Sequence, residues 1–85
     1  MNKLTTKIEA LIAAMGNEAK LGEVKTRKGV TTVVVGVTTG YKEALANNLR
    51  KIVKAKKSDD YAVQTDRVSF GVRGFEHAIV VRFAA

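Results

Sequence analysis

Apolar residues recur at helical spacing in two segments of the chain. In the first segment they fall on one face of a helix, at positions Leu4, Ile8, Leu11, Ile12 and Met15. Gly16-Asn17 follows, and both residues tolerate the left-handed backbone that ends many helices. In the second segment one apolar stripe consists of Tyr41, Ala44, Leu45, Leu49, Ile52 and Val53. The spacing predicts helices over 3–16 and 41–57, and Thr38-Thr39-Gly40 offers a Thr or Gly cap for the second.

Four other segments have the composition of β-strands. VTTVVVGV at 30–37 is the strongest, because β-branched residues resist helix and fit a pleated sheet. Its consecutive valines suit a central strand. A weaker strand over 21–27 precedes it, and Arg27-Lys28-Gly29 predicts a tight hairpin between the two. Residues 61–70 and 77–83 complete the set, with a turn over 71–74 (GVRG) between them.

The predicted order is α-β-β-α-β-β within one small domain, 1–85. We expect an α+β fold, a two-layer sandwich in which a four-stranded, mainly antiparallel sheet carries two helices on one face. The other face then presents apolar residues such as Val34 and Val80. The sequence offers no further element to cover them.

Composition narrows the class of protein. With 46% hydrophobic and 27% charged residues, the chain is typical of a folded soluble domain. It has no Cys, which excludes disulfides, thiolate metal sites and thiol catalysis. No apolar run approaches the roughly 18–20 residues of a membrane span, and the N-terminal segment lacks the solid apolar block of a secretory signal. We expect a cytoplasmic protein with no membrane partner, no metal and no other cofactor.

Charge is concentrated in the segment 41–57. The formal net charge is +7, and this segment holds six basic residues against one acid, Glu43. Ordinary exposed helices intersperse the two signs, so the imbalance favours a polyanionic partner. We predict a small basic protein that binds nucleic acid, DNA or RNA, mainly through the phosphate backbone and with weak sequence specificity. The predicted contacts are Lys42, Arg50, Lys51, Lys54 and Lys57, with Arg73, Arg27 and Lys28 as outlying contacts.

A second hypothesis belongs to a different class. A short basic chain of this kind also fits an interaction protein that docks on an acidic surface of a host enzyme or complex and modulates it. A solvated lysine face that serves only solubility would explain the same charge pattern without any partner. The sequence does not separate these alternatives.

Other short motifs favour structure over chemistry. The stretch 36–40 (GVTTG) lies between a strand and a helix, but the three residues between its glycines and the missing Lys exclude a Walker loop. GVRG has the spacing of a KH loop, yet predicted strands flank it instead of helices. The single histidine, His77, should be partly buried, and Glu76 should point to the opposite sheet face. No serine has an adjacent base, so we predict that the protein is not an enzyme.

We expect the protein to form a homodimer. Two helices cover only one face of a four-stranded sheet, so the second apolar face or a strand edge is available for association. Two-fold pairing is the commonest arrangement. Sedimentation equilibrium at micromolar concentration should give twice the monomer mass of 9.2 kDa. A clean 9.2 kDa species would mean that other residues cover the second face or that this topology is wrong.

Overall fold

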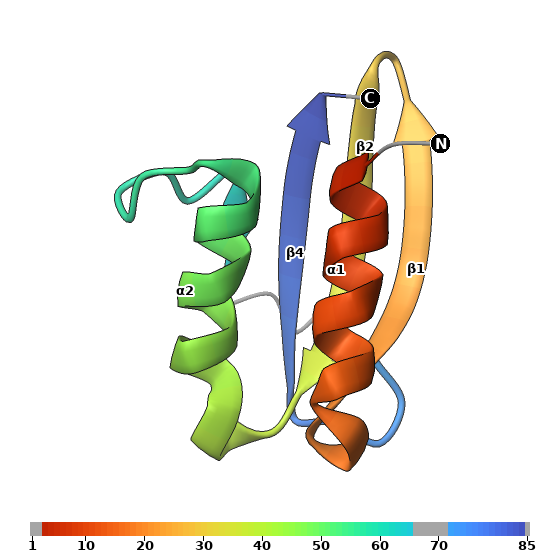
Figure 1. Cartoon of the computed structure of the whole chain (residues 1–85), viewed down its shortest axis with the longest axis vertical. Coiled ribbons are helices and arrows are strands. Elements are labelled where there is room, and N and C mark those ends of the chain that lie inside the picture. The colour runs from red at the N-terminus through yellow and green to blue at the C-terminus, as the bar shows by residue number, and fades with distance from the viewer. Residues whose placement is uncertain (1–2, 66–71, 85) are drawn as a thin grey trace.

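Two α-helices and four strands form two layers in the computed structural model, which describes residues 3–65 and 72–84. The strands make one antiparallel sheet in the order β1-β2-β4-β3. Both helices lie on the same face of it (Figure 1). The predicted α+β fold and its α-β-β-α-β-β order are confirmed. The elements are α1 (Lys3–Ala14), β1 (Ala19–Arg27), β2 (Val30–Val37), α2 (Lys42–Val53), β3 (Val63–Gln64) and β4 (His77–Ala84).

The central position of β2 agrees with its run of valines. It pairs with β1 on one side and with β4 on the other, where the register runs from Val30 opposite Ala84 to Val37 opposite His77. The β1–β2 connection is the predicted tight hairpin. Lys28 and Gly29 both have positive φ angles, 52° and 77°, which is the backbone of a type I′ turn whose twist matches that of the strands.

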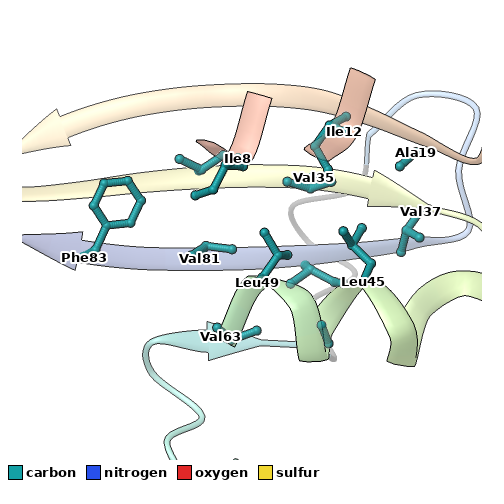
Figure 2. Packing of buried hydrophobic residues seen from close by; sticks show 13 residues of the cluster. Ile8, Ile12, Ala19, Val35, Val37, Leu45, Leu49, Val63, Val81 and Phe83 are labelled. Atoms are coloured by element: carbon teal, nitrogen blue, oxygen red, sulfur yellow. The ribbon is translucent and has the colours of Figure 1, made fainter. Parts of the chain in front are cut away.

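The core lies between the sheet and the two helices (Figure 2). The sheet contributes alternate residues of its two central strands, all inaccessible to solvent: Val33, Val35, Val37, Ile79 and Val81. The helices contribute Ile8, Ile12, Leu45, Ala46 and Leu49. Each buried side chain of the Val, Leu or Ile type stabilises a fold by about 1.5–3 kcal/mol. Because the chain has no cysteine, this packing is the main source of its stability.

The ends of α1 are close to those predicted. The helix stops at Ala14 and Gly16 takes a positive φ of 60°, as expected for a left-handed stop. A short 3₁₀ turn, Gly16–Glu18, then leads into β1. Within the described residues, no helix is long and apolar enough to cross a membrane.

The strand predicted over 61–70 is far shorter in its described part. Within residues 61–65, Val63 and Gln64 form β3, because the residues just before them form a turn. In that turn Asp59 Oδ1 accepts hydrogen bonds from the backbone N–H groups of Tyr61, at 3.2 Å, and Ala62, at 3.1 Å. An Asp side chain that binds the backbone two or three residues ahead favours a turn over a strand. Residues 66–70 of the predicted strand and residue 71 of the predicted turn lie outside the described residues.

The sheet face opposite the helices is partly covered by the chain itself. Val34 and Val80 are only 5% and 0% exposed, and Val72 packs against them. Two strand glycines leave room for this cover. A Cβ at Gly36 would lie 2.6 Å from Cβ of Val72 and 2.9 Å from Cδ2 of Phe75, and Gly22 is also close to Val72. The expectation that nothing in the chain covers this face is therefore wrong.

Substitution of Gly36 should test the packing of segment 72–75 on the sheet. Gly36→Ala should destabilise the protein by about 1–3 kcal/mol, because the added methyl group would overpack against the side chains of Val72 and Phe75. Gly40→Ala is the matched control, since nothing lies within 4 Å of its Cβ position. It should leave the stability unchanged or raise it by up to about 1 kcal/mol. Urea unfolding gives both values, and equal stabilities for the two variants would contradict this packing.

Candidate functional site

One side of α2 is fixed against the sheet. Leu45, Ala46 and Leu49 are buried, and consecutive residues of a helix diverge by about 100°. Lys42 and Arg50 therefore lie half-buried beside the packed stripe, whereas Lys51 is exposed. The apolar packing of α2 thus decides which of its basic side chains lie next to neighbouring elements and which face solvent only.

The predicted Thr or Gly cap at the start of α2 is wrong, because Tyr41 is the N-cap residue. A 3₁₀ turn, Thr39–Tyr41, precedes the helix, and neither Thr38 nor Tyr41 makes a side-chain capping hydrogen bond. The threonine hydroxyls bind other elements instead. Thr38 Oγ1 donates to Glu18 Oε2 at 2.8 Å, and Thr39 Oγ1 donates to Glu76 Oε2 at 3.1 Å. These bonds attach the β2–α2 connection to the starts of β1 and β4.

Thr39 also brings His77 and Glu76 to the same place, which was not expected. His77 Nε2 lies 3.1 Å from Thr39 Oγ1. Because the single hydroxyl hydrogen of Thr39 is directed to Glu76, Nε2 of His77 is the donor in this contact. Strand alternation predicted that the side chains of Glu76 and His77 point to opposite faces of the sheet. Both bind Thr39 instead. Alternation does not apply here, because β4 begins at His77 and Glu76 lies just before it. The described residues contain no group of three metal-binding side chains.

The helix predicted to reach residue 57 ends at Val53. Lys54 adopts the left-handed conformation, with φ 57° and ψ 42°, and the backbone N–H of Ala55 donates to the carbonyl of Arg50 at 2.9 Å. This is the hydrogen bond of a Schellman motif, in which an apolar residue after the turn packs back on the helix. Ala55 is half-buried against the core cluster. Lys54, Lys56 and Lys57 are therefore not in the last turn of α2.

This turn creates a groove beside α2 that gathers three of the predicted contacts. The groove has a volume of about 360 Å³ and lies between one flank of the helix and the segment 57–65. Lys42, Arg50 and Lys57 supply its positive charge, and Glu43 supplies one negative charge. Among the described residues, its full lining is Lys42, Glu43, Ala46, Arg50, Lys57 and Thr65. We call it the α2 groove.

Arg50 is anchored on the surface of α2 by a neighbouring side chain. Its Nη1 donates to Asn47 Oδ1 at 2.9 Å, which orients the guanidinium along the helix surface. Its Nε is buried and has no hydrogen-bond acceptor among the described residues. A buried donor without an acceptor is unfavourable, and more so on a charged group. An anion in the α2 groove would supply acceptors to a guanidinium that is already partly ordered.

The other predicted contacts lie elsewhere on the molecule. Lys51 and Lys54 are exposed but do not line the α2 groove. Arg73 lies in the segment 72–75 on the opposite face of the sheet, and Arg27 and Lys28 are at the β1–β2 hairpin. The sequence analysis did not single out Thr65 as part of the site. Its position depends on the path of the 54–62 turn, for which the sequence carries no periodic signal.

No protein-family model, curated protein or solved structure matches the chain. A function must therefore be inferred from the geometry and charge of its own residues.

The left-handed conformation of Lys54 can be tested by whether a glycine at this position raises or lowers the stability of the protein. Lys54→Gly should stabilise the protein by about 0.5–1 kcal/mol, because glycine adopts this conformation without the steric penalty of a side chain. Lys56→Gly removes the same charge outside the helix and serves as the control, with little change expected. Thermal and urea unfolding measure both. Destabilisation by Lys54→Gly of about 1 kcal/mol, the effect of glycine inside a helix, would contradict a helix end at Val53.

Proposed function

We propose that the protein binds nucleic acid through the phosphate backbone, with the α2 groove as its main contact. The observation that carries this proposal is the convergence of Lys42, Arg50 and Lys57 on one concave surface. The first two come from a single helix, and the third comes from the turn that follows it. Among the described lining residues, three cations stand with one carboxylate, and this positive balance attracts a polyanion.

The chemistry of the groove suits phosphate oxygens. The guanidinium of Arg50 presents planar donors that match the oxygens of a phosphate, whereas the two lysines act as point charges. Each bound phosphate would displace counterions condensed on the nucleic acid, so affinity should fall steeply with salt. The exposed Lys51, on the same helix, and Lys54, just after its last residue, add to the positive field. Arg73, Arg27 and Lys28 would meet only a ligand long enough to pass round the sheet.

Weak sequence specificity follows from the shortage of free base-reading groups on α2. The side-chain amides of Asn47 and Asn48 are the obvious candidates for adenine. Asn47 Oδ1 already accepts a hydrogen bond from Arg50. Asn48 is rotated from it by about 100°, so the two amides cannot read one base together.

We further propose that the protein is a binding protein and not an enzyme, and that it forms a homodimer. The covered second face of the sheet shifts the proposed dimer contact to the outer edge of β1, a nine-residue strand with an exposed surface. Lys20, Lys25 and the irregular register between Leu21 and Val24 oppose edge pairing. Such a dimer would therefore be weak.

The α2 groove can be tested with two variants of equal charge. Arg50→Gln/Lys57→Gln removes two groove cations, and Lys51→Gln/Lys54→Gln removes two cations from the same region outside the groove. On a short DNA duplex, the groove variant should reduce the slope of log K against log salt by about 1.8, or 0.9 for each lost phosphate contact. The control variant should change the slope and the affinity less. Fluorescence anisotropy at several salt concentrations gives both quantities.

Three outcomes would contradict the proposal in different ways. Equal losses in the two variants would mean that binding follows net charge and not the α2 groove. No measurable binding by the unmodified protein would exclude nucleic acid as the partner. A protein that co-purifies in stoichiometric amount after nuclease treatment, and is lost in the groove variant, would favour the modulator hypothesis.

A further inference from the structure

Tyr61 is the most exposed large apolar side chain of the described residues, with 64% of its surface accessible. It lies in the turn before β3, between Lys57 and Thr65, which both line the α2 groove. It is four positions along the chain from each, so its Cα lies within about 14 Å of theirs even for an extended chain. Its ring packs on Arg82, whose side chain lies on the sheet face of Val34 and Val80, opposite the helices. A ligand that uses both the α2 groove and this ring must therefore turn round the β3 edge of the sheet.

The position of Tyr61 is held by neighbouring side chains. The guanidinium carbon of Arg82 lies 4.8 Å from the centre of the tyrosine ring, within the range of a cation–π contact. The same guanidinium donates from Nη1 to the carbonyl of Tyr61 at 3.1 Å and to Gln64 Oε1 at 3.0 Å. Asp59 Oδ1 accepts from the backbone N–H of Tyr61. Both the backbone and one ring face are thus restrained, and the large accessible surface leaves the opposite ring face open.

We propose that the open face of Tyr61 stacks on an unpaired base, so that the ligand of the α2 groove is single-stranded nucleic acid. This inference rests on the proposed function and specifies its substrate class. Proteins that bind single strands combine a positive groove for the backbone with aromatic rings for the bases. A duplex keeps the faces of its bases inside its own stack, so it can use the groove but not Tyr61. Arg82 is a positioning residue in this arrangement, because it contacts the ring and not the base.

Tyr41 provides a matched control for the stacking role. It is also exposed, with 48% of its surface accessible, and it directly precedes Lys42 at the start of α2. It does not line the α2 groove. The chain has two tyrosines and no tryptophan, so its ultraviolet emission reports on these two rings alone.

The experiment compares a single-stranded oligothymidylate with a DNA duplex of equal length, by fluorescence anisotropy at several salt concentrations. The unmodified protein should prefer the single strand. Tyr61→Ala should weaken single-strand binding about 5-fold or more and leave duplex binding and the salt slope unchanged. The single-strand affinities of Tyr61→Phe and Tyr41→Ala should stay within about 2-fold of that of the unmodified protein. The first variant keeps an aromatic ring at position 61, and the second changes a residue that does not line the α2 groove. Circular dichroism checks that each variant is folded.

Tyrosine emission and Arg82→Lys supply independent readouts. Binding of the single strand should quench the emission of the unmodified protein, after correction for absorption, whereas Tyr61→Phe, which emits from Tyr41 only, should show no quenching. Arg82→Lys keeps the charge but loses the planar contact with the ring. It should reduce both the quenching and the single-strand affinity without changing duplex affinity.

The possible failures are distinguishable. If the unmodified protein binds duplex and single strand equally and Tyr61→Ala changes neither, the stacking inference is wrong while the phosphate-binding groove stands. If Tyr61→Ala weakens both ligands equally, the ring has a structural or general role and the inference is again wrong. If neither oligonucleotide binds, the proposed function and this inference both fail.

Discussion

The alternate valines of β2, buried beneath both helices, are the contact on which the rest of the structure depends. Val33 and Val35 are fully buried in the cluster that α1 and α2 share with the sheet. Figure 2 shows Val35 on β2 among the apolar side chains of this cluster. This contact also fixes how α2 is rotated about its axis. Since Leu45 and Leu49 must face the sheet, Arg50 is directed to the flank of the helix. The geometry of the α2 groove is thus a consequence of core packing as much as of charge.

The elements with strong periodicity were predictable from sequence, and those defined by single contacts were not. β-Branched residues at 30–37 gave the bounds and central place of β2, and Lys28-Gly29 gave the hairpin turn. The strand expected over 61–70 failed in its described part, because one carboxylate, Asp59, turns the backbone there. The cover of the second sheet face depends on the absence of a side chain at Gly36. Periodicity describes only side chains that are present.

The candidate site was predicted as a set of charges but not as a shape. Eight cations were expected to contact a ligand, and Lys42, Arg50 and Lys57 converge on the α2 groove. In a continuous helix, Lys57 would lie about 10 Å beyond Arg50 along the axis. It approaches instead because Lys54 takes a left-handed conformation, which lysine seldom adopts and residue type alone does not indicate. The half-buried Ala55 just after it was the available signal, since it interrupts an otherwise basic run.

The pairing of β2 with β4 also has a consequence for how the chain is made. β1 and β2 are joined by two residues, whereas the 39 residues after Val37 must be synthesised before His77, the first residue of β4, appears. At roughly 5–20 residues per second, this interval is about 2–8 s. During that time the valine-rich strand has one unpaired edge, which can template wrong partners. The ribosome-bound chain therefore spends seconds with β2 paired to β1 on one edge and without its β4 partner on the other.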